Sequence, residues 1–399
     1  MTATRRAVAR VALVSILAIG GTLIRPDAAD AQTIGDVLSF LLTNRTVATG
    51  DFVRDEQAAA ATGDAIADFL VSELGALPIS SSAGGFVYRL NPDIGVTTRL
   101  SDSFGPFFAE RALTTGAGNF SIAISYTKTR FDTIDGRELK DGSLVATAAK
   151  LHTDTTPFDV ETLTLDLRTD TVTVFGNLGV TDRVDVGLAV PVIRLELDGQ
   201  RVDTYRGTSF TQAIASGSAV GVGDIVLRGK WNVYQSGASG IAIGAESRLP
   251  TGDETNLLGT GEATITPRFI ASWESDRTAF HGNAGFVFGG GSQDIDYRAA
   301  ATVAVAPRLT LVGELAGRQL ESVGRLTDVT SSHPSLANVD TIRLSTTTDS
   351  TNRLVVVGGM KWNIASTWLV TANVLHPLTE SGLNANWTPT ITLDYSFGR

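Results

Sequence analysis

One stretch near the C-terminus decides the fold class: WTPTITLDYSF, residues 387–397. Its apolar residues fall at every second position, from Trp387 to Phe397, and threonines, Asp394 and Ser396 fill the positions between. Because successive side chains of a strand point to opposite faces, the segment has one apolar and one polar face. A strand with lipid on one side and a polar interior on the other has this pattern.

The same alternation recurs from about residue 118 onward and predicts twelve strands. They are expected at 119–131, 162–178, 184–198, 223–234, 240–249, 262–274, 278–289, 294–305, 309–320, 353–364, 367–376 and 386–397. Short turns alternate with mostly longer links, as in transmembrane barrels with tight periplasmic turns and long external loops. We therefore predict an all-β protein: a twelve-stranded antiparallel transmembrane β-barrel over 119–397, preceded by a short, partly helical N-terminal segment.

The composition excludes several other classes of protein. The chain of 399 residues has no cysteine, which removes thiol catalysis and cysteine-based metal sites. A net charge of -10 gives no electrostatic basis for binding nucleic acid. The histidines have no metal-ligand spacing; they are His152, His281, His333 and His376. The sequence therefore predicts no catalytic residue, no metal and no cofactor.

The N-terminus carries the three parts of a secretory signal. Arg5, Arg6 and Arg10 precede an apolar stretch at 11–24, and small residues at 29–31 precede Gln32. We expect cleavage after residue 31, export, and insertion into the outer membrane of a Gram-negative type of cell by the barrel-assembly machinery. Residues 32–118 are expected to be partly helical, at 34–42 and 55–74, and to form either a periplasmic segment or a plug.

The inward faces of the predicted strands carry charged side chains. A charge on the lipid face would cost about 2–4 kcal/mol at mid-depth, which places these residues in the lumen. The predicted lumen-facing residues are Arg228, Lys230, Glu246, Arg248, Glu262, Arg268, Arg298, Glu314, Arg318, Lys361 and Asp394. They could form an ion-paired lumen that keeps the barrel rigid, or a polar path for a solute.

Aromatic residues mark two further features. Trp231, Trp273, Trp362 and Trp368 lie on apolar faces beside short turns and predict an aromatic belt at the periplasmic interface. A second group precedes the first strand and predicts a plug that forms part of an apolar site. It consists of Phe86, Tyr88, Phe104, Phe107 and Phe108. A linker without this role is the alternative.

The predicted hairpin 162–198 is irregular, because its apolar face changes phase along both strands. The apolar residues Leu163, Leu165 and Leu167 are followed by Val172 and Val174. A paired bulge would produce this change, and so would strands that extend past the membrane and pair above it.

Several motifs resemble an outer-membrane family of transporters of the phenol meta-cleavage degradation pathway, which is similar in style to fatty-acid and aromatic-hydrocarbon channels. They are FGPFFAERALT at 104–114, NLGVTDRVDVG at 177–187, GDI at 223–225, LPTGDE at 249–254 and NLLGTG at 256–261. The resemblance covers the chain from about residue 104 onward. It implies an outer-membrane barrel that passes small hydrophobic or aromatic compounds.

The sequence thus predicts a barrel without enzymatic activity that allows passive uptake of small hydrophobic or aromatic solutes. Its expected partners are outer-membrane lipid, the assembly machinery and the solute. Two alternatives remain at this point: a structural or adhesive barrel with a sealed lumen, and an outer-membrane barrel hydrolase.

Overall fold

The computed structural model describes residues 33–42, 81, 85, 88–91, 96–99, 101 and 103–397, apart from 291, 322–324, 334–335, 348–349 and 366. The predicted signal segment and the predicted helix at 55–74 lie outside these residues. The run Ile34–Leu42 forms the helix α2, as predicted. Among the described residues, no helix has the length and apolar character needed to cross a bilayer.

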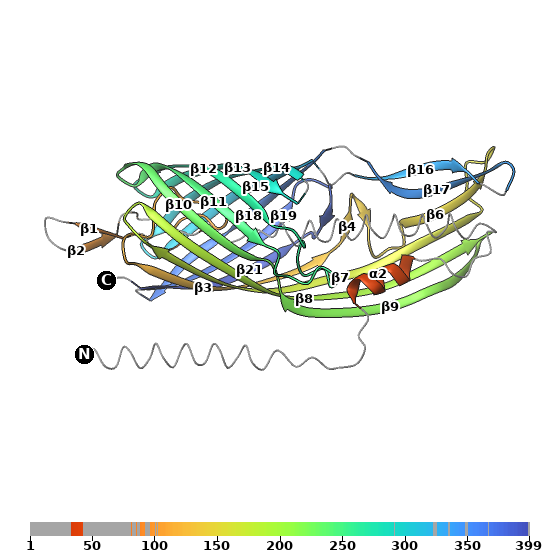
Figure 1. Ribbon diagram of the computed structural model, residues 1–399, viewed down its shortest axis with the longest axis horizontal. Coiled ribbons are helices and arrows are strands. Elements are labelled where there is room, and N and C mark those ends of the chain that lie inside the picture. The colour runs from red at the N-terminus through yellow and green to blue at the C-terminus, as the bar shows by residue number, and fades with distance from the viewer. Residues whose placement is uncertain are drawn as a thin grey trace. The chain divides into compact units, whose positions relative to one another are not determined.

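Twelve antiparallel strands form a closed ring. Figure 1 shows these strands from the side. In ring order they are β3 (Phe120–Phe131), β7 (Asp159–Gly179), β8 (Val184–Tyr205), β10 (Ile225–Ser236), β11 (Ser239–Leu249), β12 (Thr264–Ser275), β13 (Thr278–Gly289), β14 (Ser292–Ala306), β15 (Leu309–Leu320), β18 (Thr351–Ala365), β19 (Trp368–Pro377) and β21 (Thr388–Phe397). β21 pairs with β3 and closes the ring. The predicted barrel is therefore confirmed.

Short turns join these strands at one end, where β3 begins and β21 finishes. Because short turns are periplasmic in transmembrane barrels, we call this end periplasmic and the opposite end outer. Between the ends, large apolar side chains cover the outward faces, among them Phe269, Phe280, Leu311 and Leu393. An exposed apolar surface of this extent marks contact with lipid.

The change of phase predicted for 162–198 has its cause in the length of β7 and β8. These strands pair residue by residue from Asp159 to Gly179 without a register shift, so the bulge alternative is wrong and the extended strands are the explanation. The inward face of β7 is apolar at Leu163, Leu165 and Leu167 and polar at Thr169 and Thr171. The strand thus leaves the membrane at this point and enters a structure with an apolar interior.

That structure is an outer extension, which the sequence predicted only as loops. Four strands join β7 and β8 above the membrane: β6 (Leu144–Leu151), β9 (Thr208–Val222), β16 (Leu326–Ser332) and β17 (Val339–Thr346). Three short strands form a separate small sheet, namely β4 (Thr133–Ile134), β5 (Arg137–Glu138) and β20 (Leu383–Asn384). The short-range alternation of these segments is weak, which is why the sequence did not distinguish them from loops.

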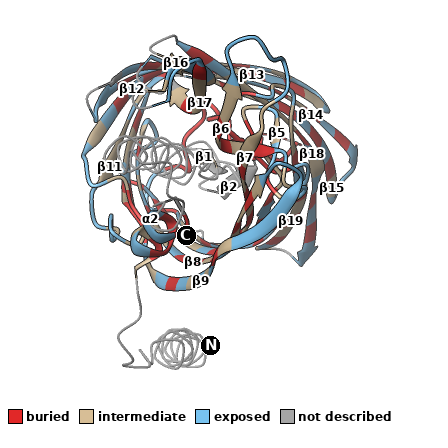
Figure 2. Cartoon of the chain, turned by 90° about the vertical axis from the view of Figure 1, so that its right-hand side faces the viewer, coloured by how far each residue is buried: buried red, intermediate tan, exposed pale blue. Residues whose placement is uncertain are grey.

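The extension encloses an apolar core, and α2 is part of it. Ile34, Val37, Leu38 and Leu41 are buried together with leucines of β7 and β8. Figure 2, which views the molecule from its outer end, shows α2 inside the ring beside β8 and β9. A further hairpin precedes the barrel, formed by β1 (Tyr88–Asn91) and β2 (Val96–Arg99).

Candidate functional site

A non-strand segment, residues 103–117, lies inside the periplasmic half of the barrel; we call it the lumen segment. Its backbone is held by inward side chains of many strands rather than by strand pairing. Near its start, Phe104 N–H donates to Thr310 Oγ1 at 3.1 Å on β15. Near its end, Thr115 N–H donates to the Asp185 carboxylate at 2.9 Å on β8. The segment therefore follows the inner wall across the barrel.

Glu314 of β15 makes the densest of these contacts. Its carboxylate accepts the N–H groups of three successive residues: Phe107 at 3.0 Å, Phe108 at 3.0 Å and Ala109. Beside it, Arg298 donates to the Phe108 carbonyl at 2.7 Å. A carboxylate that receives several backbone N–H groups makes strong, charge-assisted hydrogen bonds. Glu314 therefore holds the turn of the lumen segment at Phe107, Phe108 and Ala109.

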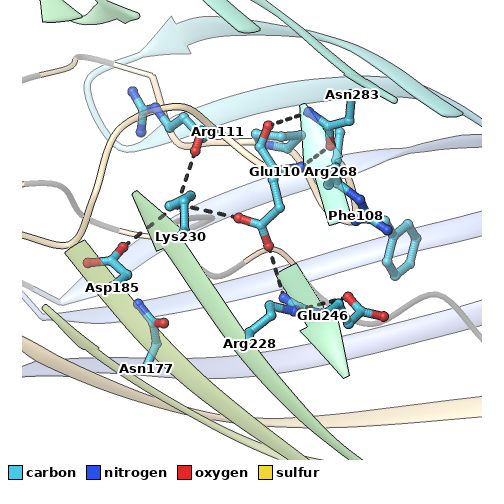
Figure 3. Close-up of polar contacts among 12 residues, drawn as sticks. Phe108, Glu110, Arg111, Asn177, Asp185, Arg228, Lys230, Glu246, Arg268 and Asn283 are labelled. Carbon is cyan, nitrogen blue, oxygen red and sulfur yellow. Dashed lines mark hydrogen bonds and ion pairs between the residues drawn. The ribbon is translucent and has the colours of Figure 1, made fainter. Parts of the chain in front are cut away.

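Glu110 of the lumen segment lies at the centre of a charged cluster (Figure 3). Its carboxylate is 2.9 Å from Arg228 and 3.4 Å from Lys230, both on β10. Arg228 also pairs with Glu246 at 3.3 Å, and Lys230 lies 3.7 Å from Asp185. The cluster joins the segment to three neighbouring strands through opposite charges.

The next residue, Arg111, forms a buried ion pair with Glu274 of β12. The two groups are 2.5 Å apart, with side chains 1% and 4% exposed. Ala112 then binds the wall on both sides: its N–H donates to Ser272 Oγ at 2.9 Å, and its carbonyl accepts from Asn232 at 2.8 Å. An ion pair that is so deeply buried holds its partners only while both charges are present.

The predicted lumen charges fall mostly on inward faces. Lys230, Arg268, Glu314 and Lys361 are buried. Arg228, Glu246, Arg248, Arg298, Arg318 and Asp394 are partly buried. Several meet partners that the sequence did not single out: Arg268 and Arg298 both pair with Asp296 at 3.0 Å, and Arg318 pairs with Asp294 at 2.7 Å.

The prediction that Glu262 faces the lumen is wrong. It precedes β12 and is exposed in the outer loop, so it does not face the lumen. The strand begins two residues later than the sequence predicted, because Gly259 and Gly261 keep the chain in a turn beside Asp224 and Glu254. The residues that sequence reasoning missed are Glu110, Asp185, Glu274, Asp294 and Asp296. Strand parity could have identified Glu274, but nothing in the sequence pattern marks Glu110 as a lumen residue.

The predicted plug residues divide into two groups. Phe104, Phe107 and Phe108 belong to the lumen segment and are 1%, 2% and 4% exposed. Phe107 and Phe108 pack against apolar residues of β15, β18 and β19, and Lys361 lies 5.5 Å from the centre of the Phe107 ring. Phe86 lies outside the described residues, as does the side chain of Tyr88, whose backbone belongs to β1.

Between the lumen segment and the wall formed by β3, β7 and β19 lies a cavity of about 60 Å³. Phe107, Phe175 and Leu369 contribute apolar surface, and Asn177 and Asn373 contribute amides. An apolar cavity of about 150 Å³ is known to accept benzene. The cavity between the lumen segment and the wall is therefore smaller than one that accepts an aromatic ring.

The four tryptophans predicted as a belt lie on the outward face, close to the short turns at the periplasmic end. Trp231, Trp273, Trp362 and Trp368 are 54%, 54%, 51% and 39% exposed. A fifth, Trp387, lies at the outer end and stacks on His376 with ring centres 4.7 Å apart. Tryptophan at these depths is typical of membrane interfaces.

One serine and histidine pair lies on the lumen wall. His281 Nδ1 is 2.9 Å from Ser272 Oγ, which already accepts the N–H of Ala112. Within the described part of the chain, His281 Nε2 has no hydrogen-bond partner, so no carboxylate orients the ring. A nucleophilic triad requires such a group, and the pair therefore gives no support to hydrolysis. In the same part of the chain, no group of three His, Asp or Glu side chains is placed to hold a metal ion.

Comparison with solved structures gives similar barrels at low sequence identity. An outer membrane channel from Pseudomonas putida F1 is 12% identical with a TM-score of 0.47, over 72% of this chain and 98% of that one. A Pseudomonas aeruginosa FadL homologue is 9% identical with a TM-score of 0.33, over 70% and 90%. The CymD monoaromatic hydrocarbon channel is 7% identical with a TM-score of 0.29, over 71% and 90%.

No curated protein matches the sequence. A family model does match, over residues 142–381, and its description is "Putative MetA-pathway of phenol degradation". The matched region runs from the outer extension through most of the barrel and spans more than half of the chain. The protein is therefore a twelve-stranded transmembrane β-barrel that belongs to the family with this description.

Proposed function

We propose that the protein is a gated channel that lets small hydrophobic or aromatic solutes cross the outer membrane passively. The observation that carries the proposal is the lumen segment, which lies inside the periplasmic half of the barrel without being part of its wall. The family description, which names phenol degradation, supports the choice of solute class. The opening step is a displacement of the lumen segment.

The contacts between the lumen segment and the barrel wall support a role of the segment as a gate. Its links to the wall are mostly hydrogen bonds and ion pairs, such as those of Glu314 and Glu110. Polar contacts of this kind can be exchanged for contacts with water when the segment moves, and hydrogen bonds to charged groups contribute a net of about 1.5–3 kcal/mol each. A wall strand could not move in this way without breaking the barrel.

Passive transport is tested by liposome swelling with the purified full-length protein. Small aromatic solutes should enter faster than sugars of similar size, because displacement of the segment would uncover Phe104, Phe107 and Phe108, which are buried in the closed state. Deletion of residues 84–103 should raise single-channel conductance in planar bilayers, since it frees one end of the lumen segment. Conductance equal to that of the intact protein would refute the proposal that the lumen segment is a gate.

A sealed structural barrel is the second candidate, and the paired lumen charges favour it. Arg268, Arg298 and Arg318 each pair with an aspartate, which leaves a well-anchored interior. Such a barrel would conduct no ions and pass neither sugars nor aromatics, before or after the deletion. The same two assays therefore separate the candidates.

The proposal includes export through residues 1–31 and insertion by the barrel-assembly machinery. The composition of 1–31 supports export, because a basic flank, an apolar stretch and small residues occur in that order. N-terminal sequencing of the protein from outer membranes should begin at Gln32. A sequence that begins at Met1 would refute cleavage.

A further inference from the structure

Positive charge in the lumen is concentrated along one row of inward positions, which we call the cationic stripe. Its members are direct cross-strand neighbours on successive strands of the ring, from β10 to β18. In ring order they are Lys230, Gly244, Arg268, Gly285, Asp296, Arg318 and Arg353. The glycines leave space for the long side chains beside them, since a Cβ at Gly285 would lie 3.4 Å from Arg268 Nε.

The stripe rises from the lumen segment to the outer end of the barrel, because barrel strands are tilted against the axis. At its lower end, Lys230 lies 3.4 Å from Glu110 of the lumen segment (Figure 3). At its upper end, Arg353 of β18 donates to the Leu383 carbonyl at 2.7 Å in the outer extension. Neighbouring strands are about 4.8 Å apart, so the stripe covers roughly 29 Å of the wall.

The carboxylates beside the stripe neutralise only part of its charge. Asp296 is shared, because Arg268 and Arg298 both pair with it at 3.0 Å. Arg318 pairs with Asp294 at 2.7 Å, and its side chain is still 25% exposed. The whole chain has a net charge of -10, so this local excess of cations is not a reflection of the composition.

Arg248 adds a cation beside the upper part of the stripe. It lies on the inward face of β11, two positions beyond Glu246, and is partly buried. Among the residues that the structure describes, it forms no ion pair. In the same part of the chain, Arg268 Nε and Arg318 Nε are buried without a hydrogen-bond partner. Guanidinium groups with unused donors suit a carboxylate, because their planar fork matches its two oxygens.

The rest of the barrel wall is lined differently. Above Asp394, toward the outer end, the inward faces of β19, β21, β3 and β7 carry hydroxyl and amide groups. They include Thr371, Asn373, Thr390, Thr392, Ser125 and Thr171. These groups form hydrogen bonds without favouring either sign of charge. The lumen therefore has one cationic side and one neutral polar side.

We propose that the cationic stripe and Arg248 form a binding path for the carboxylate of an aromatic acid of the benzoate type, from the outer end of the barrel to the lumen segment. The inference rests on the proposed function, because it specifies the charge of the aromatic solute that the channel takes. Conduction requires several sites that bind firmly enough to receive a solute and weakly enough to release it. Partial neutralisation by Asp294 and Asp296 keeps the individual sites of the stripe weak.

Binding of benzoate to the purified full-length protein tests the inference without requiring transport. A ligand that binds only the folded state raises its melting temperature, which the heat-sensitive gel band reports. Sodium benzoate should raise the melting temperature relative to sodium chloride at the same ionic strength. The neutral analogue benzyl alcohol, at the same concentration, should not.

Two variants assign the binding to the arginines. Arg248→Gln should weaken benzoate binding about tenfold or more, because hydrogen bonds to a charged group are lost. Arg318→Gln/Asp294→Asn removes a second cation together with its partner and should have a similar effect. The matched control is Arg308→Gln, which makes the same change of charge in an exposed periplasmic turn and should bind benzoate as the wild type does.

An equal rise with benzyl alcohol, or wild-type benzoate affinity in both variants with a folded barrel, would overturn the anion path. Liposome swelling separates this inference from the proposed function. If benzyl alcohol enters liposomes but benzoate does not bind, the passive channel stands and the anion path is refuted. If benzoate binds in a manner that depends on Arg248 but neither solute enters, the anion site stands and the passive channel is refuted.

Discussion

Replacement of Glu314 should open the channel if the lumen segment is its gate. The Glu314 carboxylate accepts three successive backbone N–H groups of the segment, from Phe107, Phe108 and Ala109. Glu314→Ala leaves these donors without an acceptor at a site that is 2% exposed. An unsatisfied buried donor costs about 1–3 kcal/mol, so the closed state loses at least about 3 kcal/mol.

A loss of about 3 kcal/mol corresponds to a roughly 100-fold shift from the closed toward the displaced position of the segment. Single-channel recording in planar bilayers measures this shift as the fraction of time spent open. Glu314→Gln keeps one oxygen acceptor and loses the charge, and because charge-assisted hydrogen bonds are about twice as strong as neutral ones, its effect should be intermediate.

The matched control is Glu262→Ala, which removes an exposed glutamate from the outer loop and should leave the open fraction unchanged. Samples must retain the mobility difference between unheated and boiled protein, which reports an intact barrel. If Glu314→Ala has the wild-type open fraction in an intact barrel, these hydrogen bonds do not hold the gate.

Three further changes test other contacts. Arg111→Met should destabilise the barrel by about 3–5 kcal/mol, because it leaves Glu274 buried without its partner. Adding Glu274→Gln should recover most of this loss. The melting temperature of the heat-sensitive gel band measures both effects. Gly179→Ala should destabilise the barrel by about 1–3 kcal/mol and so lower the same melting temperature, because its Cβ would overlap the carbonyl oxygen of Gly116 in the lumen segment. An unchanged melting temperature would contradict this close approach. The side chain of Asn256 holds the pKa of Asp253 below its ordinary value. The contribution of Asp253 to the order of the outer loop is therefore complete above the ordinary carboxyl range and is lost as the pH falls through its lowered pKa. Limited proteolysis should cut this loop in the wild type only under acid, and in Asp253→Asn already at neutral pH.

Much of the barrel could be predicted from the chain because each strand carries its own evidence. In residues 387–397 the alternation of apolar and polar side chains is complete, so a local pattern defines both faces. The parity of the connections then gives the strand order, because neighbouring strands pair in sequence around the ring.

The candidate site was predicted only in part. Parity placed Arg228 and Glu314 on inward faces, yet their partners Glu110 and Phe107 belong to a segment with no regular period. The path of such a segment depends on side chains from strands far along the chain. The predicted position of Glu262 was wrong for a related reason, because the start of β12 depends on the packing of the preceding loop.

The class, the strand number and the direction of most side chains could be predicted from the chain alone, because alternation within a strand is local and lipid imposes it on every strand separately. The structure adds that β7 and β8 continue beyond the membrane, that residues 103–117 lie inside the barrel, and that α2 lies at the outer end. These features depend on contacts between residues distant in the chain, such as Leu41 with Gly199 and Arg111 with Glu274. No local pattern encodes such contacts, because they arise only when the closed wall brings both partners together.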